Sequence, residues 1–139
     1  MAIKPRHFRP ETDPWLYKCP CGRAECDAPP PTSTLLYTLD VMRDDLGDAI
    51  TVTSGPRCAV HNAAEGGVKD SEHLTGQGAD LQCLTSAQRW KMLESAKRAG
   101  FRRIGIGRTF LHVGVETTGH ATEVVWTYYG ETKTRTSEQ

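Results

Sequence analysis

The residues best suited to chemistry in this chain are two histidines and an aspartate. His73 and Asp80 both lie in the short glycine-containing stretch that runs from Ser71 to Asp80. His112 lies in the apolar run Phe110-Leu111-His112-Val113. Two imidazoles and one carboxylate are the ligand set of a catalytic zinc ion with one open coordination position. If these three side chains meet in space, they predict a metal centre that activates water for hydrolysis.

The chain must fold back on itself for this to happen, because the seven residues from His73 to Asp80 would span more than about 20 Å if extended. Gly76 and Gly78 permit such a reversal, since glycine reaches backbone angles that other residues avoid. Asp80 is expected near the start of a strand and His112 on a neighbouring strand. Taken singly, each of the three is more typical of a polar residue that simply finds hydrogen-bond partners.

A cluster of cysteines near the start of the chain is a second candidate site. Cys19, Cys21 and Cys26 could form a structural zinc site with a fourth ligand from Cys58 or His61. The alternatives are one or two disulfides, for example between the N-terminal arm and Cys58, or free thiols. The odd total of five cysteines excludes a disulfide framework that uses them all. Cys83, on an apolar strand, is typical of a small buried residue.

Composition excludes several classes of partner. The 139-residue chain has 17 Lys and Arg against 17 Asp and Glu, so its formal charge is zero and nucleic-acid binding is not expected. No run of about 18 apolar residues predicts membrane insertion. The N-terminal residues lack the apolar stretch of a secretory signal, which indicates synthesis in the cytoplasm. We expect a monomer.

The elements that must position these side chains follow from periodicity and caps. Helices are predicted at 34–46 and from Thr85 or Ser86 to about Ala99, each ended by a glycine. Strands are predicted at 49–53, 79–83, 103–106, 109–115 and 122–129, with 103–115 as a hairpin and 57–76 as a long loop with a helical turn at 58–63. This mixed order favours an α+β fold with a small antiparallel sheet and flanking helices. We expect one domain, 1–139, with a cysteine-containing arm at 1–31, a catalytic core at 32–129 and a flexible tail at 130–139.

The stretch from Ser71 to Asp80 resembles the Ser-x-His-x-x-Gly-x-Ala-x-Asp signature of the zinc D-Ala-D-Ala carboxypeptidase family of murein peptidases, which shares its fold with the hedgehog signalling domain. Upstream, Thr53-Ser54-Gly55-Pro56-Arg57-Cys58 with His61-Asn62 resembles the family's Ser-Gly-Tyr-Arg-Cys-x-x-His-Asn stretch. Downstream, Gly105-Ile106-Gly107 and Phe110-Leu111-His112-Val113 resemble its Gly-x-Gly and Phe-x-His-Val-Asp ending. The early Cys19-Pro20-Cys21-Gly22 is similar to a segment of phage-borne members.

The resemblance implies a hedgehog/DD-peptidase-like fold and a zinc peptidase that cleaves peptidoglycan stem peptides, as a carboxypeptidase or an endopeptidase. It implies that His73, Asp80 and His112 bind the catalytic zinc and that activated water attacks the peptide carbonyl. Arg57 would bind a substrate carboxylate or steady the tetrahedral intermediate, and Ser71 would also contact substrate. A phage endolysin or virion component would reach the cell wall after release by lysis or with the virion.

The general base is the point at which this sequence departs from the family. Relatives carry an acid two residues after the last ligand or three before it, and these positions are Gly114 and Thr109 here. Glu116 is the nearest acid and is our candidate for the catalytic base, with Glu72 and His120 as others. The alternative is a non-catalytic zinc-binding module, structural or wall-binding, that has lost the base. Two milder departures are Gly78 in place of the signature alanine and Pro56 in place of tyrosine.

Overall fold

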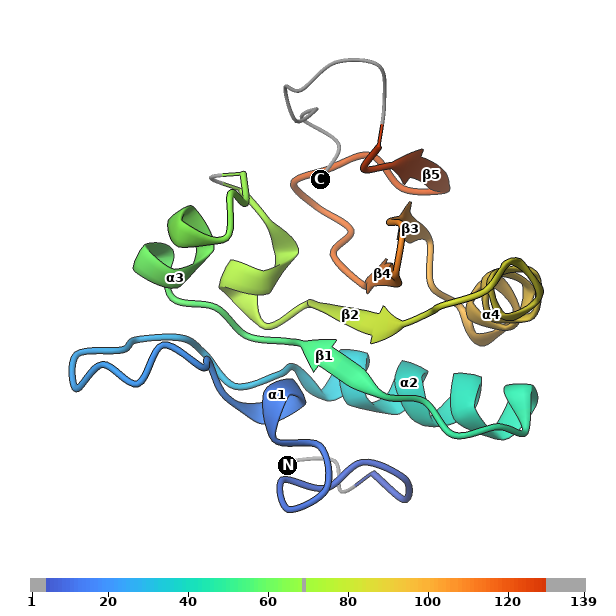
Figure 1. Ribbon diagram of the computed structural model, residues 1–139, viewed down its shortest axis with the longest axis horizontal. Helices are drawn as coiled ribbons and strands as arrows, with labels where there is room; N and C mark the ends of the chain where they lie inside the picture. Colours follow the sequence, from blue (N-terminus) through green and yellow to red (C-terminus); the bar gives the residue numbers. More distant parts are fainter. Residues whose placement is uncertain (1–4, 69, 130–139) are drawn as a thin grey trace.

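A five-stranded sheet forms the centre of the computed structural model, which describes residues 5–68 and 70–129 (Figure 1). Its strands are β1 (Val52–Ser54), β2 (Gly78–Gln82), β3 (Arg103–Ile106), β4 (Phe110–Gly114) and β5 (Val124–Thr127), arranged in the order β1-β2-β4-β3-β5. The α+β class with flanking helices is confirmed.

The sheet is mixed, which corrects the expectation of an antiparallel one. Strands β1, β2, β4 and β3 pair antiparallel in turn, including the predicted β3–β4 hairpin. Strand β5 instead pairs parallel to β3, with Gly105 opposite Trp126. The chain must therefore return from the end of β4 to the start of β3 before β5 can pair with β3. Residues 115–123 make this connection and form no helix or strand.

Two long helices cover one face of the sheet. Helix α2 (Ser33–Leu46) is capped by Thr32 and ends at Gly47, and α4 (Ser86–Ala99) begins with a capping box between Thr85 and Gln88. The helices pack against each other, and the hydroxyl of Ser95 donates to the carbonyl of Met42 over 3.1 Å. Both predicted helices are confirmed to within one residue at their starts.

The two faces of the central strands differ in chemistry because side chains alternate along a strand. Ala79, Leu81, Leu111 and Val113 are buried in the hydrophobic core together with residues of α2 and α4. Asp80 and His112 lie between them in sequence and therefore point to the opposite face. The same alternation that builds the core thus presents the polar pair away from it.

The remaining segments are less regular. The N-terminal arm contains the short helix α1 (Pro14–Tyr17), and the predicted loop at 57–76 contains α3 (Ala59–Ala64) and the 3₁₀ helix η1 (Glu72–Thr75). Figure 1 shows the arm running beside the segment that leads from β1 to α3. The tail expected at 130–139 lies outside the described residues. Within the described ranges, no helix has the length and apolar character needed to cross a membrane.

Candidate metal centre

Asp80 and His112 face each other across neighbouring strands, and His73 completes a cluster with them. Asp80 of β2 pairs directly with His112 of β4, which places their side chains on one face at close range. Asp80 Oδ1 lies 3.2 Å from Nε2 of His73 and 3.0 Å from Nδ1 of His112. One ligand atom from each residue lies within 4.8 Å of the others, and all three side chains are buried. The structure therefore brings together the three residues that the sequence singled out.

His73 is held in one orientation by the backbone. Its Nδ1 lies 2.6 Å from the carbonyl oxygen of Gly55, which can only accept a hydrogen bond, so Nδ1 carries a proton. In the neutral ring, Nε2 then keeps its lone pair toward Asp80. The reversal that delivers His73 occurs at Gly76, whose φ is +72°, as predicted. Gly78 does not adopt positive φ, and its role is different, as described below.

His112 is held by a carboxylate on its other nitrogen. Nε2 of His112 lies 2.9 Å from Oε1 of Glu72, so this histidine presents Nδ1 to the cluster. Glu72 Oε2 accepts a hydrogen bond from the backbone N–H of Glu116 over 3.0 Å. Metal-binding histidines usually donate their second N–H to such a carboxylate, which fixes the ring and raises its basicity. Glu72 therefore lies behind His112 and does not face the cluster directly.

Arg103 balances the buried charge of Glu72. Its Nε lies 3.2 Å from Glu72 Oε1, and both side chains are at most 1 % exposed. A second nitrogen of the guanidinium donates to the carbonyl of Ala121 over 2.6 Å, and the group lies 4.9 Å from the ring centre of Trp126. A buried carboxylate without such a partner would be costly.

Two glycines make room for Glu72. A Cβ at Gly114 would overlap both carboxylate oxygens of Glu72, and one at Gly78 would lie 2.8 Å from Glu72 Cβ and 2.8 Å from His112 Cε1. Gly78 and Gly114 are themselves paired between β2 and β4. Both departures from the family signature at these positions thus accommodate the same side chain.

The electrostatics of the cluster favour a cation. Burial would raise the pKa of Asp80, but the charges and hydrogen bonds of the two histidines hold it well below its usual range. Burial lowers the pKa of His73, which keeps it neutral as a ligand must be. Burial also opposes protonation of His112, yet hydrogen bonds to Asp80 and Glu72 outweigh it and raise its pKa to about 9.

Arg57 lies beside the cluster. Its guanidinium is 3.5 Å from Asp80 Oδ2 and also donates to Ser54 and Asn62, while its backbone N–H donates to the carbonyl of His73. The register between β1 and β2 shifts between Val52 and Ser54, and such an irregularity turns the strand end toward the site. The structure therefore places the Arg57 guanidinium next to the carboxylate of Asp80.

A pocket of about 380 Å³ opens beside these residues. His73, Asp80 and Arg57 line it together with Ser71, Glu65 and Tyr128 among others. Ser71, predicted to contact substrate, is buried, and its hydroxyl accepts the backbone N–H of His73 as the cap of η1. Of the described residues that line the pocket, Asp80 and Glu65 carry carboxylates.

Glu116, predicted as the catalytic base, is not brought to this pocket. Its carboxylate accepts hydrogen bonds from the backbone of Thr118 and Gly119 and lies 2.6 Å from Nδ1 of His120. It lines another pocket, together with Glu72 and His120. The chain leaves β4 after Gly114, and the carboxylate of Glu116 turns back to the residues that follow it in sequence.

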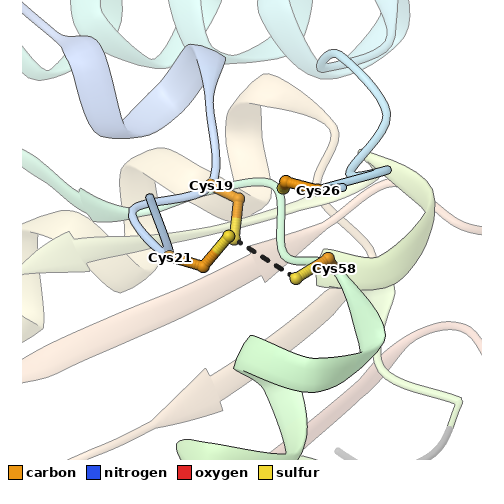
Figure 2. A group of neighbouring side chains, drawn as sticks. All are labelled: Cys19, Cys21, Cys26 and Cys58. Carbon is orange, nitrogen blue, oxygen red and sulfur yellow. Dashed lines mark hydrogen bonds between the residues drawn. The ribbon is translucent and has the colours of Figure 1, made fainter. Parts of the chain in front are cut away.

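The cysteines predicted to form a second site also converge. Cys19, Cys21, Cys26 and Cys58 gather between the arm and the start of α3, and all are free thiols (Figure 2). His61, the other predicted fourth ligand, is directed to Glu65 at 4.0 Å. Cys83 is buried in the core, away from them.

Sequence reasoning missed the residues that hold His73 and His112 in place. Arg103 gave a signal that could have been used, because an arginine in an otherwise apolar strand requires a buried counter-charge. Glu72 was considered only as a base, and the carbonyl of Gly55 offered no signal.

A family model described as Peptidase M15 matches residues 10–116. The match includes His73, Asp80 and His112 and all four clustered cysteines. A comparison with curated proteins found no match.

Proposed function

Because this chain belongs to the peptidase M15 family, a family of metallopeptidases, we propose that it is a zinc-dependent peptidase that cleaves peptidoglycan stem peptides. The observation that carries the proposal is the convergence of two imidazole nitrogens and one carboxylate oxygen from η1, β2 and β4. This nitrogen and oxygen donor set suits zinc.

His73, Asp80 and His112 would hold the ion. A zinc ion there would supply a Lewis acid that polarises a carbonyl and activates water at neutral pH. The protein's own contribution is to fix the ligands: the Gly55 carbonyl orients His73, and the carboxylate of Glu72 orients His112. Both contacts are buried, so the three donor atoms need little rearrangement when the metal binds.

Arg57 would bind the substrate's carboxylate. An arginine pairs a carboxylate through two parallel hydrogen bonds, and this guanidinium already lines the pocket. Its 3.5 Å contact with Asp80 is long for a hydrogen bond, so a substrate carboxylate offers it a better partner. Such a role fits a carboxypeptidase that recognises a terminal D-Ala, and also an endopeptidase that recognises a side-chain carboxylate of the stem peptide.

All the proposed site residues come from one chain, so activity as a monomer is proposed. A phage-type protein of this kind would act on the cell wall after release by lysis or as part of the virion.

The direct test is incubation of the zinc-loaded protein with purified peptidoglycan and with a D-Ala-terminated stem peptide, followed by mass analysis of the products. Release of D-Ala identifies a carboxypeptidase, and cross-link cleavage identifies an endopeptidase. Asp80→Asn should abolish both, while His7→Ala, which alters a histidine that pairs with Asp44 on α2 outside the cluster and its pocket, should retain them. Absence of any product from protein with the ion bound would favour the non-catalytic zinc-binding module instead.

A further inference from the structure

Four cysteine sulfurs meet at one point between two distant parts of the chain. Cys19, Cys21 and Cys26 come from the N-terminal arm, and Cys58 is the residue that caps α3 (Figure 2). The four Sγ atoms all lie within 4.8 Å of one another, and those of Cys19 and Cys58 are 3.8 Å apart. A fifth cysteine, Cys83, is buried in the core and takes no part.

The spacing of these sulfurs suits a metal better than a disulfide. Bonded sulfurs lie about 2.05 Å apart. A tetrahedral zinc ion with Zn–S bonds of about 2.3 Å separates its ligands by about 3.8 Å, which is the distance between Cys19 and Cys58. Two independent disulfides would have to draw the sulfurs into separate pairs, whereas here all four remain mutually close.

Backbone N–H groups already point at two of the sulfurs. The N–H of Arg23 donates to Sγ of Cys21 over 3.4 Å, and the N–H of His61 donates to Sγ of Cys58 over 3.4 Å. The guanidinium of Arg23 also lies 3.9 Å from Sγ of Cys58. Donors of this kind stabilise the thiolate charge that accumulates when several cysteines share one cation.

We propose that Cys19, Cys21, Cys26 and Cys58 bind a structural zinc ion that is separate from the centre formed by His73, Asp80 and His112. Four soft thiolates select zinc or iron and exclude magnesium, calcium and manganese. Closed tetrahedral coordination by four protein ligands leaves no open position for a substrate, so the role of this ion is structural.

The ion would fasten the arm to the segment that supports the first centre. Cys58 directly follows Arg57, and Gly55, whose carbonyl orients His73, lies three positions before it. The backbone of α1 packs so closely on Gly55 that a Cβ there would overlap the carbonyl of Trp15. Cys19 and Cys58 are 39 positions apart, so the ion closes a long loop, and such cross-links restrict the unfolded chain most.

Metal analysis of the full chain tests the proposal. We expect two zinc ions per chain in the wild type, one in Cys19→Ser/Cys58→Ser and one in Asp80→Asn, because each change removes a different site. Cys83→Ser is the matched control and should keep both. One zinc per chain that is unaffected by the cysteine substitutions would overturn the proposal, as would a native mass showing disulfides among the four cysteines.

Cobalt substitution gives a readout that does not depend on peptidase activity. The cobalt-loaded wild type and the Asp80→Asn variant should both show intense thiolate-to-cobalt charge-transfer absorption, and Cys19→Ser/Cys58→Ser should lose it. If that double variant does not fold, a thiol-specific mercurial added to the wild type should release one of two zinc ions. Release of none overturns the site, and iron in the purified protein overturns the choice of zinc.

Discussion

The side-chain carboxylate of Glu72 fills the space that any side chain at position 114 would need. The family's ending places an acid at the position of Gly114, two residues after the last ligand. Here the strand carries no side chain at that point, and Glu72 enters from η1 to meet Nε2 of His112. Glu72 thus occupies the space that an acid at position 114 would need, but its carboxylate contacts His112 from behind and does not face the cluster.

Replacing Glu72 should lower the affinity of the proposed metal centre for zinc. Glu72→Gln keeps the shape but loses the charge that supports His112, and we expect zinc affinity at that site to fall about tenfold. Glu72→Ala removes the buried carboxylate that offsets the charge of Arg103 and should also lower the free energy of unfolding by about 3–5 kcal/mol. Zinc titration and urea unfolding measure the two effects. Glu94→Gln, an exposed helix position, is the control and should change neither.

Moving the carboxylate from position 72 to position 114 should restore the zinc affinity that each single substitution lowers. Gly114→Asp alone forces its side chain into Glu72, and Glu72→Ala alone leaves His112 unsupported, so each should bind zinc about 10–100-fold more weakly. In the double variant Glu72→Ala/Gly114→Asp, the new aspartate occupies the vacated space and should recover most of the affinity. A double variant weaker than either single one would show that the two positions are independent.

The convergence of His73, Asp80 and His112 and most of the elements could be predicted because their determinants are local. The signature around His73 and Asp80, the cap at Thr85 and the alternation in β4 are all short-range patterns. The partners of the ligands depend on register: Glu72 reaches His112 only because Gly78 pairs with Gly114. No local pattern specifies that pairing, nor the parallel return of β5.

The position of Glu116 also could not be predicted from a short-range pattern. On an extended strand, Glu116 would lie on the same face as His112. This alternation applies only up to Gly114, the last residue of β4. The strand ends at Gly114, and hydrogen-bond donors on Thr118, Gly119 and His120 then bind the carboxylate of Glu116.

Zinc binding at the first centre should release a proton. The hydrogen bonds that raise the pKa of His112 to about 9 keep it protonated at neutral pH, and the metal needs its Nδ1 lone pair. Affinity should therefore rise about tenfold per pH unit between about pH 7 and 8. Calorimetric titration in buffers of different protonation enthalpy measures this, in the Cys19→Ser/Cys58→Ser background so that thiols release no protons. Binding without proton release at pH 7 would contradict it.

Glu116 should stabilise the fold at neutral pH and lose that effect in acid. Burial would raise its pKa, but the backbone N–H of Gly119, the ring of His120 and Thr118 lower it from 4.5 to about 2. Because the folded-state pKa is the lower one, the contribution is complete above about pH 4.5 and is lost as the pH falls toward about 2. Glu116→Gln should reduce the free energy of unfolding by about 2 kcal/mol at pH 6. In urea unfolding, that difference from the wild type should shrink with acid; a constant difference would contradict it.

Glu65 and Glu116 are two candidates for the proton acceptor of the proposed reaction, and they line different pockets. Glu65 directly follows α3 and lines the pocket beside the cluster, whereas Glu116 lines another pocket, with Glu72 and His120. A base must reach the water or the leaving amine within the substrate pocket. We therefore expect Glu65→Gln to lower turnover at least about tenfold with zinc still bound, and Glu116→Gln to change it less than about threefold. Peptide hydrolysis by each variant, measured at pH 7 with zinc content verified, decides between them. If Glu116→Gln were the more damaging change, its carboxylate would have to leave the hydrogen bonds of its own turn when substrate binds.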